Sequence, residues 1–186
     1  MRSRREPGWC EWQRLGRSRV PARFVSWLRD DGSLTLRLKC ACGDRPFAVR
    51  LLRQGWARAL PSEARRLRLR RGGLALVREV QLLCDGQPWV FARTLIPATT
   101  LRGPGQRLAR LGERPLGAVL FADRRVRRGV TEMAELRPGE QLFDSATQGL
   151  LPLPNAVWGR RTLFFMAGRP LLVNELFLPT IPGGPG

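Results

Sequence analysis

The dipeptide Asp85-Gly86 lies between two mostly apolar segments and predicts a β-hairpin. Both central residues of a type I′ turn need a positive φ angle, and Asp-Gly is a preferred pair for such a turn. If the loop is these two residues, the numbers of paired residues sum to 171, which places Arg78 opposite Arg93. Strand side chains alternate between faces, so the same face carries two apolar pairs, Leu82 with Trp89 and Val80 with Phe91.

The predicted pairing puts two like charges opposite each other at the edge of an apolar face. Such a pair is destabilising, and an unpaired charge is costly where the dielectric is low. An anionic ligand between Arg78 and Arg93 would remove this cost. The alternative is that both arginines reach solvent or meet carboxylates of the protein itself, and the hairpin alone leaves both interpretations open.

A second hairpin is predicted from Arg160 to Pro179, with its turn at Ala167-Gly168. Its second strand, PLLVNELFLP, is apolar but carries Glu175 in the middle, and the turn places Glu175 opposite Arg160. Opposite charges across a strand pair are common, so a structural ion pair is one interpretation. The other is that the carboxylate acts on a ligand.

Strands that alternate with short helices predict an α+β fold built on a single antiparallel sheet. Residues 1–20 are expected to form a basic N-terminal arm, and residues 21–186 to form one domain. Besides the hairpins, we expect helices at 21–29, 104–111 and 115–121, strands at 33–39 and 47–52, a loop at 54–62, a strand from 67 to 77 that leads into the first hairpin, and an irregular loop at 139–154.

The formal net charge of +18 would suit a nucleic-acid partner, but 32 of the 33 basic residues are arginine. That bias, together with abundant Leu, Gly, Pro and Ala, is typical of a GC-rich genome. The basic clusters at 65–71 and 124–128 are not interleaved with aromatic residues, and no recognition helix or zinc finger is evident. Specific nucleic-acid binding is therefore not expected.

Composition also limits the chemistry. The chain has no histidine, the commonest metal ligand and general base, so no metal is expected. The four cysteines (Cys10, Cys40, Cys42 and Cys84) do not predict a disulfide framework. No segment is apolar and long enough to span a bilayer or to act as a signal peptide, so a cytoplasmic location is expected.

Four motifs carry a family resemblance. REVQLLCDGQPWVFARTLIP, ERPLGAVLF, WGRR and RPLLVNELFLP occur in this order. Together they resemble the chorismate lyase family, strongly over residues 76–121 and 158–179. The resemblance implies one antiparallel sheet with short helix-turn-helix flaps that close over a buried ligand pocket. The segment at 122–157 looks longer than its counterpart in the family.

The resemblance also implies a role for single residues. Arg78 would hold the ligand carboxylate, and Arg93 would bind substrate in the same pocket. Leu116, on a flap, would offer its backbone N–H, and Glu175 would meet the ring hydroxyl. Leu34 falls where the family has a methionine that contacts the ligand from another flap.

The activity implied is the elimination of pyruvate from chorismate to give 4-hydroxybenzoate, the first committed step of ubiquinone biosynthesis. Arg78, Arg93 and Glu175 would be the catalytic residues, no cofactor would be needed, and a monomer is expected. Two alternatives remain. One is a non-catalytic small-molecule-binding domain of the same fold, as in some bacterial transcription regulators, although residues 1–60 show no DNA-binding helix-turn-helix. The other is an arginine-rich RNA-associated protein.

Overall fold

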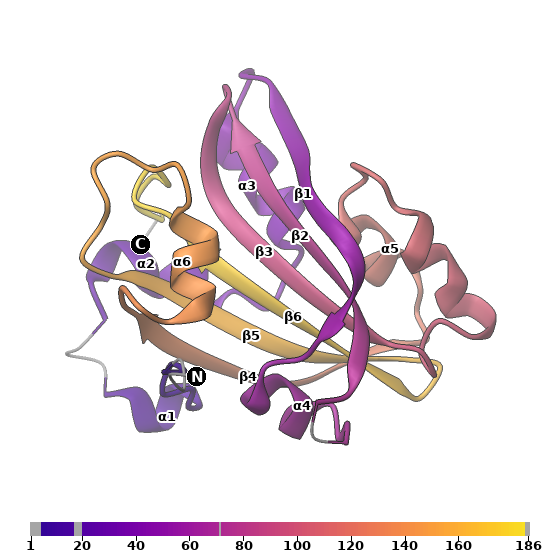
Figure 1. Ribbon diagram of the computed structural model, residues 1–186. Coiled ribbons are helices and arrows are strands. Elements are labelled where there is room, and N and C mark those ends of the chain that lie inside the picture. The colour runs from indigo at the N-terminus through magenta and orange to yellow at the C-terminus, as the bar shows by residue number, and fades with distance from the viewer. Residues whose placement is uncertain (1–4, 17–19, 71, 185–186) are drawn as a thin grey trace.

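The computed structural model describes residues 5–16, 20–70 and 72–184, and it contains one antiparallel six-stranded sheet (Figure 1). Across the sheet the strands lie in the order β1 (Phe47–Arg58), β2 (Leu74–Cys84), β3 (Gln87–Pro97), β6 (Arg169–Phe177), β5 (Val157–Met166) and β4 (Val126–Leu136). The predicted α+β fold on a single sheet is confirmed.

Helices cover both faces of this sheet. One face, here called the pocket face, is covered by α2 (Ala22–Arg29), α3 (Leu34–Cys42), the 3-10 helix η2 (Gly103–Arg110) and α5 (Leu116–Ala122). The opposite face is covered by α4 (Pro61–Arg66) and α6 (Gln141–Thr147). In Figure 1, α4 and α6 lie in front of the sheet and α2 and α3 lie behind it. A short helix, α1 (Trp12–Leu15), contacts β4.

Each face has its own apolar core. On the pocket face, Trp27 and Leu38 of α2 and α3 pack against the β2–β3 hairpin, and Leu116 and Leu120 of α5 pack with Phe164. On the opposite face, α6 and α4 pack on the strands through separate clusters. The four central strands, β2, β3, β6 and β5, are therefore mostly buried on both sides, so a polar side chain on them must find a partner or a ligand.

The first hairpin has the predicted turn but not the predicted register. Asp85 and Gly86 have φ angles of 51° and 72°, as a type I′ turn requires. However, Leu83 pairs with Pro88 and Leu82 pairs with Val90, so Trp89 is an extra residue that forms a β-bulge. Beyond the bulge every pair is shifted by one residue, and a shift of one moves side chains to the other face.

This shift overturns the predicted arginine pair. Arg78 pairs with Thr94, and Arg93 pairs with Glu79. Trp89 and Val90 both lie in the pocket-face core, whereas Phe91 lies in a core on the opposite face. Arg78 and Arg93 therefore lie on different faces of the sheet.

The second hairpin has the predicted register. Ala167 and Gly168 form its turn, and Arg160 pairs with Glu175 as predicted.

The predicted strand at 33–39 is wrong, because this segment lies in α3. Its alternating leucines fit a strand, but Leu34 and Leu38 are also one helical turn apart, and both are buried while Leu36 is 64% exposed. Ser33 caps the helix by accepting a bond from the Leu36 N–H, and Gly43 ends it at a φ of 64°.

Three further predictions are wrong. The predicted loop at 54–62 is the end of β1 followed by α4, and β1 pairs with β2. The predicted strand at 67–77 begins only at Leu74. The predicted loop at 139–154 contains α6. The helices predicted at 21–29, 104–111 and 115–121 correspond to α2, η2 and α5.

A disulfide bond and the N-terminal residues make further contacts in the fold. No disulfide was predicted, but Cys42 at the end of α3 is bonded to Cys84 at the end of β2. Of the predicted N-terminal arm, residues 1–4 and 17–19 lie outside the described residues. In the described part, Glu6 accepts bonds from Ser62, and Cys10 forms a β-bridge with Met133. Every helix within residues 5–16, 20–70 and 72–184 is too short or too polar to cross a membrane.

Candidate active site

A small pocket lies between the pocket face of the sheet and the first turns of α3 and α5, with about 50 Å³ of free space. Most of its wall is apolar, including Val80, Leu82, Ala92 and Val173 from three strands. Its charged lining residues are Arg78, Arg128, Arg160 and Glu175. Three guanidinium groups and one carboxylate give the lining a net charge of +2, so the pocket suits a dianion.

Arg78 is a buried cation without a carboxylate partner among the described residues. It is 2% exposed, and its Nη2 donates to the carbonyl oxygens of Gly112 at 2.9 Å and Arg114 at 3.0 Å. Its Nε is buried and has no acceptor. Burial lowers the pKa of the Arg78 guanidinium, but an arginine remains protonated at neutral pH. This group is therefore ready to bind an anion.

Glu175 is held in the pocket by Arg160. The Arg160 Nε donates to Glu175 Oε2 at 2.6 Å, and the Arg160 Nη1 donates to the carbonyl oxygens of Trp27, at 3.0 Å, and Asp30. Arg160 is only 1% exposed, so it is a fixed support. Oε1 of Glu175 has no partner in the part of the chain that the structure describes, which leaves it free to accept a bond from a ligand hydroxyl.

Arg128 is a pocket residue that the sequence reasoning missed. Its Nη2 donates to the Asp30 carbonyl oxygen at 3.3 Å, whereas its Nη1 is buried without an acceptor. Burial and the nearby charge of Arg160 lower its pKa, partly offset by the carboxylate of Glu175. Arg128 pairs across strands with Phe164, and no local pattern in the sequence announces that long-range pairing.

Leu34 and Leu116 occupy equivalent places on the two flaps. Each is the first residue of its helix, α3 or α5, and each lines the pocket. Backbone N–H groups in the first turn of a helix have no intrahelical acceptor. The flaps also contact each other, since a Cβ added to Gly117 of α5 would lie 3.1 Å from Thr35 Oγ1 of α3. Together they close the pocket.

The expectation that Arg93 shares this pocket is wrong. Arg93 lies on the opposite face, is 4% exposed and does not line the pocket. It donates to Glu63 Oε1 at 3.0 Å and to Glu79 Oε1 at 2.6 Å. Burial alone would lower the pKa of Arg93, but the two carboxylates raise it above its ordinary value.

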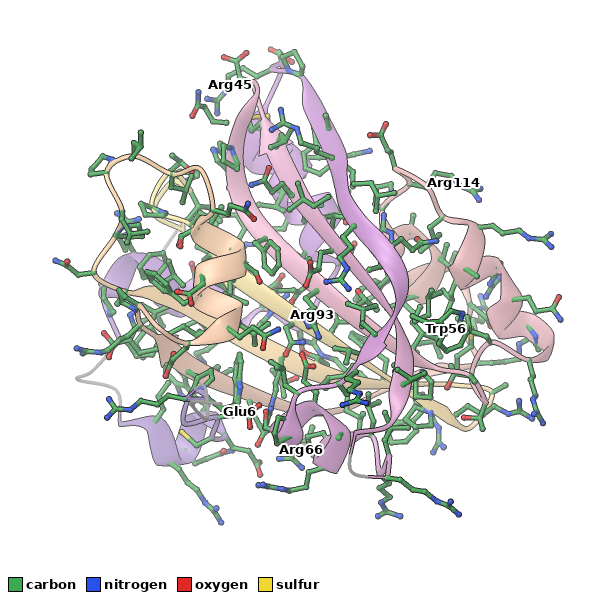
Figure 2. The ribbon with its side chains drawn as sticks, viewed as in Figure 1. Glu6, Arg45, Trp56, Arg66, Arg93 and Arg114 are labelled. Carbon is green, nitrogen blue, oxygen red and sulfur yellow. A yellow bond between two sulfur atoms is a disulfide. The ribbon has the colours of Figure 1, made fainter. Side chains whose placement is uncertain are left out.

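The surroundings of Arg93 form a closed structural network. Glu63 also accepts bonds from the Leu60 N–H at 2.9 Å and from Asn174 Nδ2 at 3.1 Å, which gives its two oxygens four donors in all. Figure 2 labels Arg93 near the middle of the sheet, Arg114 beside α5 and Arg66 in α4. With its charge matched inside the protein, Arg93 has no need of a ligand.

Residues 8–182 match the family model described as chorismate lyase. The chain is 51% identical over 158 residues to a protein of Methylococcus capsulatus named probable chorismate pyruvate-lyase, which covers 84% of this chain and 94% of the relative. A protein of Aromatoleum aromaticum with the same name is 47% identical, over 91% of each chain.

Solved structures share the fold at low sequence identity. The effector domain of PhnF from Mycobacterium smegmatis superposes with a TM-score of 0.56 at 20% identity, over 80% of this chain and 89% of that one. The ligand-binding domain of a GntR-family regulator from Bordetella bronchiseptica gives a TM-score of 0.53 at 18% identity, over 77% and 90% of the two chains.

Proposed function

Because the chain belongs to the chorismate lyase family, we propose that it eliminates pyruvate from chorismate and releases 4-hydroxybenzoate, the step that commits carbon to ubiquinone synthesis. One observation carries this proposal. Arg78, a buried cation with no carboxylate partner among the described residues, and Glu175, a carboxylate with a free oxygen, line the same mostly apolar pocket.

These two groups match the two polar ends of the product. The ring carboxylate binds the Arg78 guanidinium, which offers its unsatisfied Nε–H. The backbone N–H groups of Leu116 and Leu34 add donors from the flaps. The hydroxyl at the far end of the ring donates to Glu175, and Arg160 keeps that carboxylate in place. The apolar wall, including Val80 and Val173, contacts the faces of the ring.

The reaction needs few catalytic groups from the protein. The ether C–O bond breaks, the ring carbon that bears the hydroxyl loses its hydrogen, and the departing enolpyruvyl group gains a proton at its methylene carbon to become pyruvate. Aromatisation of the ring drives the step. Glu175 orients the hydroxyl, while positioning and the positive pocket supply most of the rate.

We also propose that the reaction needs no cofactor, that the active unit is a monomer and that the protein acts in the cytoplasm. Elimination involves no net redox change, which supports the proposal of a cofactor-free reaction.

The closed flaps have a consequence for turnover. A free space of about 50 Å³ holds only a few waters, so α3 and α5 must separate to admit chorismate and to release the aromatic product. 4-Hydroxybenzoate keeps both the carboxylate and the hydroxyl contacts. We therefore propose that product release limits the turnover rate.

The test is to incubate the purified protein with chorismate, with and without EDTA, and to measure 4-hydroxybenzoate by chromatography and pyruvate by an enzymatic assay. Equal amounts of both products in both samples are expected. Tight binding of 4-hydroxybenzoate without any turnover would instead indicate a non-catalytic binding protein. Activity lost in EDTA and restored by a metal would refute the cofactor-free reaction.

A further inference from the structure

Arg128 differs from the other charged groups in the pocket, because it has neither an ion-pair partner among the described residues nor a contact with the ring carboxylate or hydroxyl of the proposed ligand. Arg160 is matched by Glu175, and Arg78 is matched by the ring carboxylate of the proposed ligand. Arg128 makes one bond, at 3.3 Å, to the Asp30 carbonyl oxygen, and its Nη1 remains buried without an acceptor. A partly buried guanidinium with a free N–H is costly unless a ligand satisfies it.

The position of Arg128 indicates which part of a ligand it meets. Arg128 and Arg160 both donate to the Asp30 carbonyl oxygen, and Arg160 is bonded to Glu175, so Arg128 lies at the Glu175 end of the pocket. Arg78 instead donates to Gly112, in the loop between η2 and α5. In addition, Arg78 comes from β2 and Arg128 from β4, with three strands between them.

Chorismate has its second negative charge at the matching end. Its enolpyruvyl ether is on the ring carbon next to the one that bears the hydroxyl, and its ring carboxylate is at the far end. A molecule bound through Arg78 and Glu175 therefore presents the enolpyruvyl carboxylate beside Glu175, where Arg128 has a free N–H.

We propose that Arg128 binds the enolpyruvyl carboxylate and thereby makes the pocket select the dianionic substrate over its monoanionic product. This inference rests on the proposed function. When the C–O bond breaks, the carboxylate bound to Arg128 leaves with pyruvate. 4-Hydroxybenzoate then keeps only the contacts with Arg78, Glu175 and the flaps, so Arg128 adds affinity for the substrate and none for the aromatic product.

A purely structural role for Arg128 predicts something different. Through Asp30, Arg128 also holds the loop that joins α2 to α3. If it only positioned this loop, its loss would disturb the α3 flap and weaken substrate and product together. The two roles are separated by comparing chorismate with 4-hydroxybenzoate in the same variant.

The experiment measures kcat/KM for chorismate and the inhibition constant of 4-hydroxybenzoate in Arg128→Met, Arg128→Lys and a control, Arg127→Met. Arg127 is exposed, and as the neighbouring strand residue it points to the other face. For Arg128→Met we expect kcat/KM to fall about 30-fold or more, as expected for the loss of one charged partner, with the inhibition constant changed less than threefold. Arg128→Lys should recover part of the loss, and Arg127→Met should behave as wild type.

The inference is overturned if Arg128→Met changes both constants equally or changes neither. If Arg128→Met does not fold, Arg128→Lys decides the matter, because a higher KM with an unchanged inhibition constant supports the inference and parallel changes refute it. Failure of the wild-type protein to convert chorismate would refute the proposed function itself, and the wild-type assay separates that result from any effect of Arg128.

Discussion

Replacing Arg78 with methionine should separate ligand binding from folding. Methionine keeps much of the length of the side chain and removes its charge. In the free protein, Arg78 has no carboxylate partner among the described residues, and its two hydrogen bonds go to carbonyl oxygens of exposed residues, Gly112 and Arg114. Water can replace those bonds, and removal of an unpaired buried charge offsets their loss. The free energy of unfolding should therefore change by less than about 1 kcal/mol.

The affinity of Arg78→Met for the ligand should fall much more than its stability. In the complex, the ring carboxylate would be a buried anion bound to Arg78, and truncation of one partner of such a pair costs about 2–5 kcal/mol. This range corresponds to a dissociation constant for 4-hydroxybenzoate that is roughly 30 to 4,000 times higher. Chorismate should be weakened to a similar extent, because both molecules carry the ring carboxylate.

The assay is isothermal titration calorimetry with 4-hydroxybenzoate, together with urea unfolding of the free protein. Arg114→Met is the matched control, because the Arg114 side chain is exposed and only its backbone carbonyl contacts Arg78. The reasoning is refuted if Arg78→Met binds 4-hydroxybenzoate within threefold of wild type. A loss of several kcal/mol of stability in the free protein would refute the description of Arg78 as unpaired.

Three further predictions follow from the same contacts. Glu175→Gln should fold and yet lower turnover roughly 10- to 150-fold, the value of one hydrogen bond to a charged group, and wild-type turnover in a folded variant would contradict the role of Glu175. Arg93→Met should lower the free energy of unfolding by about 3–5 kcal/mol because it leaves buried carboxylates unpaired, while folded protein should bind 4-hydroxybenzoate normally; a stable variant with weak binding would return Arg93 to the site. Reduction of the Cys42–Cys84 bond, which spans 42 residues, should lower stability by about 4 kcal/mol in urea unfolding, and an unchanged midpoint would contradict this.

The local signals in the sequence predicted the turns correctly, but they could not predict the register. Asp85-Gly86 and Ala167-Gly168 both form the turns expected of them. For the second hairpin this was enough to pair Arg160 with Glu175. In the first hairpin, Trp89 adds one residue to its strand, and a single added residue exchanges the two faces. Whether a bulge forms depends on how the tryptophan packs against the core. Counting residues from the turn gives no information about that packing.

Part of the candidate site could also be predicted from the sequence. Arg78, Glu175, Leu116 and Leu34 all line one pocket, although Leu34 does so from a helix where a strand was predicted. Arg128 lay in a basic cluster that looked like a solvated surface. Its position depends on the pairing of β4 with β5, which joins residues 36 positions apart, so only the three-dimensional structure brings it to the pocket.

The central claim is that the pocket beneath α3 and α5 is the place where chorismate becomes 4-hydroxybenzoate. The most direct test is a crystal structure of the protein with 4-hydroxybenzoate bound. We predict the ring in this pocket, its carboxylate within hydrogen-bonding distance of the Arg78 guanidinium and its hydroxyl within the same reach of Glu175. A product molecule bound elsewhere, or bound in the pocket with its carboxylate turned away from Arg78, would contradict the account.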